Sequence, residues 1–246
     1  MTKVVLLNGR SKSGTHLLQM GEMLGNACFA PHRDGWQVLL DKKERKRLFN
    51  NDMFFLSGHY QWTRASEKLL RSLNAKMVLI IRDLRDVLTS FYRAMKIRNL
   101  SAEFWQPVLT AYNSYGSGNQ QEQIFEDMLL DKFGKGGTAP KHFMHTYFPW
   151  MEVDFCYVTR FEKLIGSRGG GDDLIQKKEL QRIYEFIELP QTDEWYRTHA
   201  LKLYNENSLI FSPGGGVGAY RRYFSKKNID TFERVAGEVH RAMGYK

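Results

Sequence analysis

Four short apolar runs recur along the chain, and their alternation with helical segments constrains the fold more than any other feature. The runs are Val4–Leu7, Met53–Leu56, Met77–Ile81 and Val153–Val158. Each has the length of a buried strand and is bounded by turn formers or charged residues. Apolar residues at helical spacing follow the first and third runs. The pattern predicts an α/β domain with a mainly parallel sheet, whose ligands bind at the carboxyl ends of the strands.

The rest of the chain adds helices and loops to this domain. Helices are expected over residues 17–24, 87–95, 177–189 and 228–243, the last beginning near Asp230. Residues 98–149 predict irregular helices and loops that cover one face, and residues 166–173 predict a flexible loop. No internal repeat and no convincing linker divides the chain, so residues 1–246 are expected to form a single domain.

Composition limits the partners and the compartment. The chain of 246 residues carries 36 Lys and Arg against 27 Asp and Glu, a net charge of +9 that favours an anionic partner such as a nucleotide, a nucleic acid or a membrane surface. Two cysteines, Cys28 and Cys156, are too few for a disulfide framework, which indicates a reducing compartment. No stretch approaches eighteen apolar residues, so we expect a cytoplasmic protein without a membrane span or signal core.

The first apolar run leads into a loop suited to binding an anion. Gly9 and Gly14 have the spacing of the glycines in a nucleotide-binding P-loop, but Thr15 and His16 stand where that loop has its Lys and Ser/Thr, and the lysine is Lys12. Small residues let backbone N–H groups approach a phosphate ahead of a helix. We therefore expect anion binding and a three-layer sandwich like that of P-loop nucleoside triphosphate hydrolases.

Lys12-Ser13-Gly14-Thr15 resembles a loop of known function. In sulfotransferases that use 3′-phosphoadenosine 5′-phosphosulfate (PAPS), the 5′-phosphosulfate loop commonly reads PKSGTTW. Ser11 replaces its proline, and His16 and Leu17 replace its last two residues. The resemblance implies that the donor is bound by Lys12, Ser13, Gly14, Thr15, His16 and Leu17.

A second resemblance begins at the end of the third apolar run. Residues 82–92, RDLRDVLTSFY, are similar to the family's 3′-phosphate motif RNPKDVxVSYY. Arg82 sits at a strand end, and Ser90 lies a little over two helical turns further on, so both could reach one anion. The resemblance implies that Arg82 and Ser90 bind the donor's 3′-phosphate. Asp83 and Leu84 depart from the usual Asn and Pro.

A third segment offers a base. His59 follows the second apolar run, 23 residues before Arg82, and resembles the histidine of the family's KTH-type motif. Histidine is the side chain best suited to take a hydroxyl proton near neutral pH. The resemblance implies that His59 is the general base and that Lys12 assists catalysis. Ser57 stands where many members carry a lysine.

Two further segments resemble the family in part. Residues 157–164 are similar to the RYEDL segment, with Phe161 in the place of a tyrosine that approaches the adenine. Residues 211–221 resemble the RKGxxGxW loop, which implies that Gly214 and Gly215 bind the donor. Pro213 and Gly214 replace the Arg-Lys pair, so two positive charges near the 3′-phosphate are lost. Arg221 or Arg222 is a candidate source of charge.

These resemblances predict a PAPS-dependent sulfotransferase that sulfates a hydroxyl group on a small molecule or glycan, leaves the adenosine bisphosphate PAP, and needs no metal and no nucleic acid. Two alternatives stay open. One is a P-loop kinase-like phosphotransferase that uses ATP and magnesium, with Asp83 as a metal ligand. The other is a non-catalytic protein that binds a nucleotide or a sulfated polymer. His142 and His145 form an HxxH pair without a third candidate ligand nearby. The sequence leaves the acceptor and the oligomeric state undetermined.

Overall fold

The computed structural model describes most of the chain as two compact units. The described residues are 3–18, 28–30, 41, 43, 53–96, 110, 112–115, 120–133, 140–204 and 215–246. The first unit combines residues 1–82 with 146–205, and the second combines residues 83–145 with 206–246. Each unit is described by itself below.

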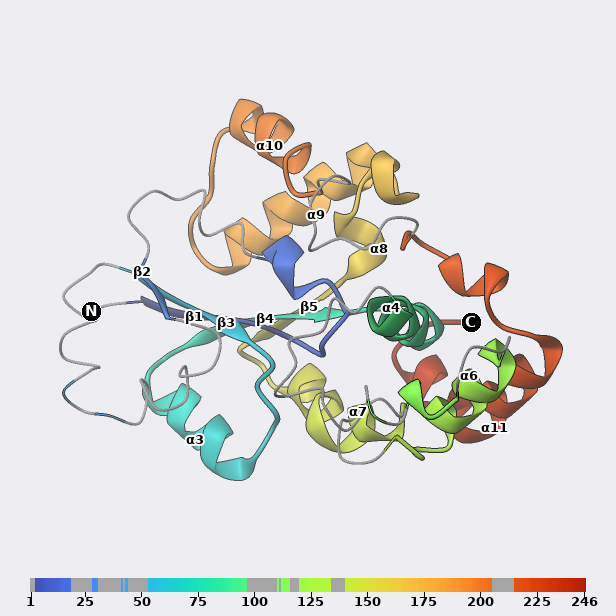
Figure 1. Ribbon diagram of the computed structural model, residues 1–246. Helices are drawn as coiled ribbons and strands as arrows, with labels where there is room; N and C mark the ends of the chain where they lie inside the picture. The colour runs from blue at the N-terminus through green and yellow to red at the C-terminus, as the bar shows by residue number, and fades with distance from the viewer. Residues whose placement is uncertain are drawn as a thin grey trace. The chain divides into compact units, whose positions relative to one another are not determined.

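The first unit is built on a five-stranded parallel sheet (Figure 1). Its strands stand in the order β2-β3-β1-β4-β5, and every neighbouring pair is parallel. The strands are β1 Lys3–Gly9, β2 Cys28–Ala30, β3 Met53–Gly58, β4 Lys76–Ile81 and β5 Cys156–Arg160. β1 and β4 are apolar almost throughout because helices cover both faces of the sheet.

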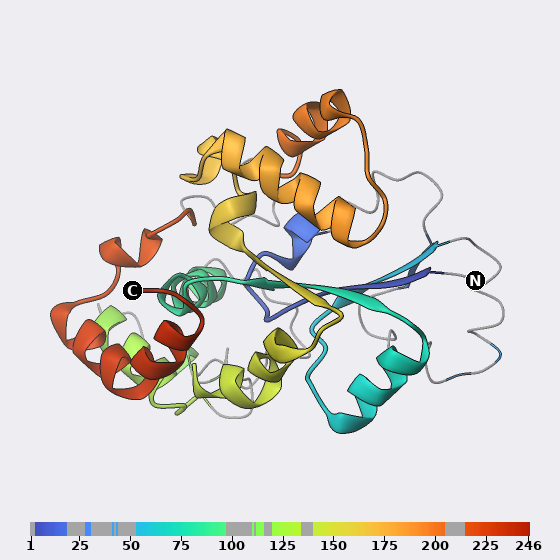
Figure 2. The same ribbon diagram turned by 180° about the vertical axis from the view of Figure 1, so that it is seen from behind.

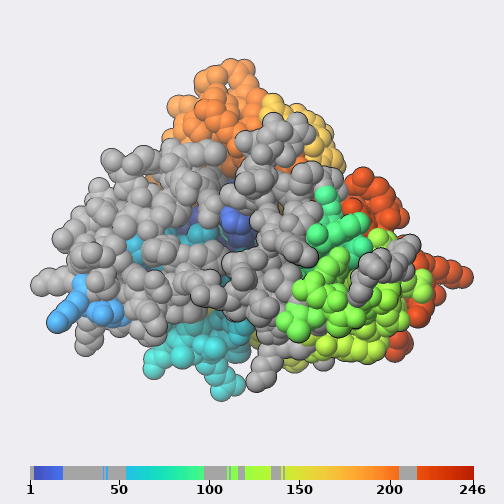
Figure 3. Space-filling view, in the orientation of Figure 1, coloured from blue at the N-terminus to red at the C-terminus, as the bar shows by residue number. Residues whose placement is uncertain are grey.

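Helices lie on both faces of this sheet. Helix α3 (Arg64–Ser72) covers one face, while α8 (Phe161–Leu164) and α9 (Asp173–Phe186) cover the other, and α10 (Asp193–Ala200) packs on α9 (Figures 1 and 2). In the space-filling view, side chains of α3 and of α10 stand at opposite ends (Figure 3). The predicted three-layer α/β sandwich with a parallel central sheet is confirmed.

The strand ends differ from the sequence prediction in two places. β5 begins at Cys156 rather than at Val153, because the 3₁₀ helix η2 (Phe148–Glu152) and a turn occupy the preceding residues. Strand β2, only three residues long, was not predicted, and it pairs only at the edge of the sheet. A strand this short leaves no periodic pattern in the sequence.

A buried carboxylate joins β5 to helix α9. Glu179 is 1% exposed and accepts hydrogen bonds from the hydroxyls of Thr159 (2.8 Å) and Tyr157 (3.3 Å). The helix begins earlier than predicted, at Asp173, because the side chain of Asp172 accepts a hydrogen bond from the backbone of Ile175. This packing fixes the end of β5, from which Arg160 leads directly into α8.

The second unit is helical. Its helices are α4 (Leu84–Lys96), α6 (Gln121–Leu129), η4 (Ala219–Arg222) and α11 (Lys226–Ala242), while α7 (Lys141–Thr146) ends where the chain returns to the first unit. Glu126 of α6 is buried and accepts hydrogen bonds from Asn228 (3.0 Å) and Thr231 (2.9 Å) of α11. α11 begins before the predicted Asp230 because Ser225 and Asn228 form a capping box.

Within the described part of the chain, no helix is both long enough and apolar enough to cross a membrane. The 3₁₀ helix η3 (Ser167–Gly169) interrupts the segment that was predicted as a loop before α9.

The central strands dominate the stability of the first unit. Leu79 of β4 is fully buried, so Leu79→Ala is expected to lower the free energy of unfolding by about 2–5 kcal/mol, measured by urea denaturation. Leu174 on α9 is 59% exposed, and Leu174→Ala is the matched control, with an expected change within about 0.5 kcal/mol. Equal losses in the two variants would contradict the placement of β4 in the core.

Candidate functional site

The carboxyl ends of three adjacent strands bring the predicted motifs together. β2 and β3 lie on one side of β1, and β4 and β5 lie on the other, so the strand order reverses between β1 and β4. Asn8 pairs with Gly58 on β3, and Gly9 pairs with Ile80 on β4. Because ligands of open parallel sheets bind at such a reversal, these strand ends form the candidate site.

The loop after β1 is a tight turn held by its own backbone. Ser13 donates its N–H to the carbonyl of Arg10 (3.0 Å), and Leu17 donates to Gly14 (2.8 Å) at the start of a 3₁₀ turn over residues 15–18. Lys12 has a φ of 69° and Gly14 a φ of 95°. A Cβ on Gly14 would lie 2.5 Å from the ring of Phe161, so only glycine fits there. The predicted helix beyond residue 18 lies outside the described residues.

Several polar groups of this turn suit an anion. The hydroxyl of Ser13 is buried and has no hydrogen-bond partner among the described residues. The backbone N–H groups of Gly14 and Thr15 likewise donate to no described residue. The N–H of Ser13 itself is used inside the turn, His16 is exposed, and the side chain of Leu17 is in the core. The turn therefore offers a hydroxyl and two N–H groups that fit a phosphate group.

Arg82, at the end of β4, contacts the same turn. Its side chain is buried, and Nη1 donates to the carbonyl oxygen of Lys12 at 3.1 Å. Burial lowers the pKa of Lys12, and the nearby guanidinium of Arg82 lowers it further. No carboxylate of the described residues pairs with Lys12. Two cations thus lie side by side where the sequence predicted two phosphate motifs, and a bound anion would stabilise both.

The ring of Phe161 lies against both Arg82 and the turn after β1. The ring is 3% exposed, and the guanidinium carbon of Arg82 lies 3.9 Å from the ring centroid. The same ring contacts Gly14. The resemblance implied that Phe161 lies near the donor's adenine, whereas its described contacts are with the loop and with Arg82. Phe161 thus orients two predicted binding elements, and its role toward adenine stays a prediction.

His59 is anchored beside the same loop. Its Nδ1 lies 2.6 Å from the carbonyl oxygen of Gly9. A carbonyl only accepts, so Nδ1 carries the proton, and in the neutral ring Nε2 is the basic nitrogen. The hydroxyl of Ser57, at the family's lysine position, is buried without a hydrogen-bond partner among the described residues. With Nδ1 as the donor to Gly9, the proton-accepting nitrogen of the neutral His59 ring is Nε2.

Asn8 is a positioning residue that the sequence analysis missed. Its side chain is fully buried, donates to the carbonyl of Tyr60 (2.9 Å) and accepts from the N–H of Tyr60 (2.8 Å). Trp150 donates to the same carbonyl at 3.0 Å. These bonds hold the segment that carries His59 against β1. The signal available in the sequence was an asparagine at the end of an apolar strand, because a buried side-chain amide needs hydrogen-bond partners.

In the second unit, Ser90 is half-buried on α4, and Asp83 precedes that helix. The Asp83 carboxylate accepts hydrogen bonds from Arg85 (2.7 Å) and from His240 of α11 (3.1 Å). Burial alone would raise the pKa of Asp83, but the hydrogen bonds and charges of His240 and Arg85 outweigh burial and hold the pKa well below its ordinary value. Asp83, a metal ligand in the kinase-like alternative, here joins α4 to α11.

The glycine-rich segment before α11 is held by α4. The carboxylate of Asp86, 1% exposed, accepts hydrogen bonds from the N–H groups of Gly218 (2.7 Å) and Tyr220 (2.9 Å). Gly215 belongs to this segment and is half-buried, whereas Gly214 lies outside the described residues. No short pattern in the sequence indicates this role of Asp86.

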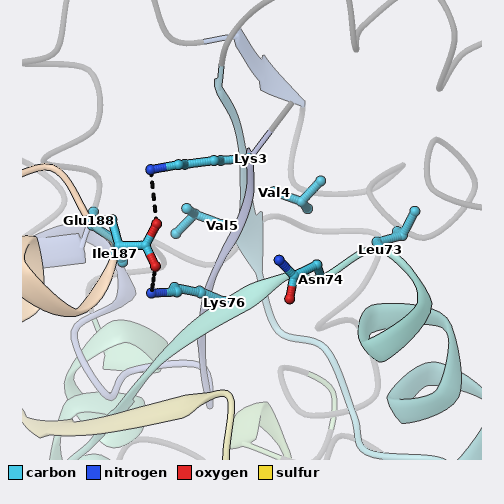
Figure 4. Close-up of a pocket in the computed structure, with 8 residues that line it drawn as sticks. All are labelled: Lys3, Val4, Val5, Leu73, Asn74, Lys76, Ile187 and Glu188. Carbon is cyan, nitrogen blue, oxygen red and sulfur yellow. Dashed lines mark hydrogen bonds and ion pairs between the residues drawn. The ribbon is translucent and has the colours of Figure 1, made fainter. Parts of the chain in front are cut away.

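A pocket at the opposite edge of the sheet is a separate feature (Figure 4). It lies at the amino ends of β1 and β4, where the carboxylate of Glu188 pairs with Lys3 (2.9 Å) and with Lys76 (2.6 Å). Hydrogen bonds from Lys76 and Lys3 lower the pKa of Glu188 to about 2. Both lysines pair with this one carboxylate, and none of the predicted motifs lines the pocket.

The HxxH pair contributes no described metal cluster. His142 lies 3.2 Å from Asp131, and His145 is exposed. Across the residues that the structure describes, no group of three or more His, Cys, Asp or Glu side chains is arranged to hold a metal ion.

Comparison with known proteins identifies the family. The family model for the sulfotransferase domain matches residues 34–244. No curated protein matches the chain in sequence. Among solved structures, the mouse sulfotransferase SULT7A1 complexed with PAP is similar with a TM-score of 0.65 and 14% identity, over 99% of this chain and 87% of that one.

Two structures of retinol dehydratase are also similar. One, in complex with androsterone and the inactive cofactor PAP, has a TM-score of 0.60 and 14% identity, over 96% of this chain and 80% of that one. The other, in a complex with retinol and PAP, has a TM-score of 0.58 and 13% identity, with coverage of 96% and 80%. At this identity the likeness concerns the fold.

The family match covers most of the chain, and the chain belongs to the sulfotransferase domain family. The expectation of a sulfotransferase enzyme is confirmed.

The ion pairs of Asp83 make stability depend on pH. Asp83→Asn is expected to lower the free energy of unfolding by about 2 kcal/mol at pH 7, because two charge-assisted hydrogen bonds are weakened. The folded pKa of Asp83 lies below the unfolded value of about 3.9, so the stabilisation is complete above that value and is lost as the pH falls toward the folded pKa. Urea denaturation should show a difference between wild type and variant that shrinks as the pH falls below about 4.

Asp154→Asn is the matched control for Asp83→Asn. Asp154 pairs with Arg71, but its side chain is 78% exposed, so the expected change is within about 1 kcal/mol. A difference between wild type and Asp83→Asn that grows as the pH falls below about 4 would contradict the role assigned to Asp83.

Proposed function

We propose that this sulfotransferase transfers the sulfuryl group of PAPS to a hydroxyl acceptor and releases PAP, with His59 as general base. One observation carries the proposal: Arg82, from the predicted 3′-phosphate motif, donates to the carbonyl of Lys12, from the predicted 5′-phosphosulfate loop. Two motifs separated by 70 residues in sequence meet at one edge of the sheet, next to His59. Two phosphate motifs at one edge suit a donor with phosphates at both its 3′ and 5′ positions.

The chain's own groups account for donor binding. Lys12, the Ser13 hydroxyl and the N–H groups of Gly14 and Thr15 would hold the 5′-phosphosulfate, and Arg82 the 3′-phosphate. When bound, PAPS supplies an activated sulfuryl group. Lys12 and the loop N–H groups then balance the negative charge that grows on the 5′-phosphate as the sulfur–oxygen bond breaks. Ser90, as the motif implies, would also bind the 3′-phosphate.

His59 would act on the acceptor. With Nδ1 donating to the Gly9 carbonyl, Nε2 takes the proton of the acceptor hydroxyl while the oxygen of that hydroxyl forms its bond to sulfur. The hydrogen bond at Nδ1 fixes the ring and makes the developing imidazolium more stable. Asn8 binds the backbone of Tyr60, the residue after His59, so the imidazole stays in place while the acceptor attacks.

We propose a small-molecule alcohol as acceptor. The structures similar to this chain include complexes with androsterone and with retinol, and that analogy favours such an acceptor.

The cysteine usage favours the cytoplasm as the compartment. Cys156 is a free thiol, and burial raises its pKa to about 12, which keeps it protonated and poorly reactive.

His59→Ala is expected to lower kcat by about 10²–10⁴-fold because the acceptor proton loses its base. The rate of formation of sulfated product is measured with PAPS and a mixed library of alcohols in the presence of EDTA. The product is detected by a mass increase of one sulfuryl group. The affinity for PAP should stay within about twofold of wild type. His145→Ala, at an exposed histidine, is the matched control. Near-normal turnover of His59→Ala would exclude His59 as the base, and activity only with ATP and magnesium would favour the kinase-like alternative.

Arg82→Ala is expected to weaken PAP binding by about tenfold or more, because a charge-assisted contact to phosphate is lost. Isothermal titration calorimetry measures the Kd. Arg71→Ala is a matched control, since Arg71 also lies over a phenylalanine ring, that of Phe155, at 5.0 Å, but on α3. Binding of PAP by Arg82→Ala as tight as that of wild type would refute the 3′-phosphate assignment.

A further inference from the structure

Helix α8 carries the ring that lies against the candidate site. Phe161 is the first residue of this helix, and its ring contacts the guanidinium of Arg82 and the backbone of Gly14. The helix is only four residues long, too short to be stable by itself. The position of the ring therefore depends on what packs against α8.

A buried carboxylate of helix α9 binds the chain on both sides of Phe161. Before that ring, the hydroxyls of Thr159 and Tyr157 donate to Glu179 at 2.8 and 3.3 Å. After it, the ammonium group of Lys163 lies 3.4 Å from the same carboxylate. Glu179 thus joins the end of β5 and α8 to one point on α9, and the two helices lie side by side (Figures 1 and 2).

Gln176 binds the other end of α8. It stands three residues before Glu179, so both side chains lie on one face of α9. Its side chain is 2% exposed and donates to the carbonyl oxygen of Leu164, the last residue of α8, at 2.6 Å. The last carbonyls of a helix lack partners within that helix, and Gln176 supplies one. Two side chains of α9 thus hold α8 from its start to its end.

The contacts of Glu179 require its negative charge. A carboxylate only accepts hydrogen bonds, and its partners here are two hydroxyls and an ammonium group, all of them donors. Burial, and next the charge of Glu179, raise the pKa of Tyr157 to about 12, so the Tyr157 hydroxyl keeps the proton that it donates. A glutamine of the same size would turn an amide N–H group toward one of these donors.

We propose that Glu179 and Gln176 are positioning residues for donor binding, because from α9 they fix α8. They thereby hold the ring of Phe161 against Arg82 and Gly14. The described partners of the Glu179 carboxylate lie on β5, α8 and α9, so its effect reaches the site through these elements. The inference rests on the proposed function, because PAP is the ligand that reports on the site.

A double-mutant cycle, titrated with PAP by calorimetry on the full chain, tests the proposal. Glu179→Gln is expected to weaken PAP binding by about tenfold, because the ring and the guanidinium lose their fixed positions. Phe161→Ala should weaken binding at least as much. Adding Glu179→Gln to Phe161→Ala should then change the Kd by less than about twofold, since the ring through which Glu179 acts is gone. A purely structural role of Glu179 would not produce this non-additivity.

Glu126→Gln is the matched control. Glu126 is also a buried helical carboxylate, and it accepts hydrogen bonds from Asn228 and Thr231 within the second unit. Its substitution should lower stability while the affinity for PAP stays within about twofold. Urea denaturation verifies that each variant is folded under the conditions of titration. Gln176→Ala, expected to weaken PAP binding by about threefold, takes the place of Glu179→Gln in the cycle should that variant not fold.

The outcomes separate this inference from the proposed function. If the wild-type protein does not bind PAP, the proposed function fails and this inference fails with it. If wild type binds PAP and the folded variants Glu179→Gln and Gln176→Ala bind it as tightly, the proposed function stands and the positioning role is wrong. Equal weakening by Glu179→Gln with and without the Phe161 ring, or equal weakening by Glu126→Gln, would also overturn it.

Discussion

The hydrogen bond from Arg82 to the carbonyl oxygen of Lys12 is the interaction on which the candidate site depends. It joins the end of β4 to the turn after β1 at 3.1 Å, in a position where the guanidinium is almost completely buried. A buried guanidinium needs hydrogen-bond acceptors, and a backbone carbonyl supplies one without adding negative charge. The contact fixes the position of the Arg82 guanidinium against the turn after β1.

That interaction places the positive charges of Arg82 and Lys12 beside each other. Their repulsion costs free energy when no anion is bound. Burial and the charge of Arg82 both act against the ammonium form of Lys12, which lowers its pKa. Phe161 offsets part of this cost, because its ring face attracts the guanidinium at 3.9 Å and its edge fits against Gly14. The turn is thus held by contacts within the protein itself, which lowers the ordering cost of binding an anion there.

Two buried side chains make the neighbouring segments rigid in the same way. The side chain of Asn8 hydrogen-bonds the backbone N–H and C=O of Tyr60, which pair with no neighbouring strand. The carboxylate of Asp86 accepts hydrogen bonds from the backbone N–H groups of Gly218 and Tyr220. Each satisfies N–H or C=O groups that have no ladder or helix partner. Asn8 steadies the segment with His59, and Asp86 steadies the turn at Gly218.

The sequence by itself predicted four of the five strands and the helices α4, α9 and α11, and it indicated candidate motifs at residues 12, 59 and 82, because these depend on local periodicity and on short patterns of residue type. Strand β2 and helices α3 and α10 were not predicted. The sequence prediction placed the starts of β5, α9 and α11 several residues away from their observed positions, since caps and turns decide those ends. Only the tertiary structure decided that Arg82 contacts Lys12, that Phe161 lies against Arg82 and Gly14, and that Asn8 and Asp86 hold the loops. These contacts join residues 52 to 147 positions apart, and no local pattern records which distant backbone group a buried side chain will meet.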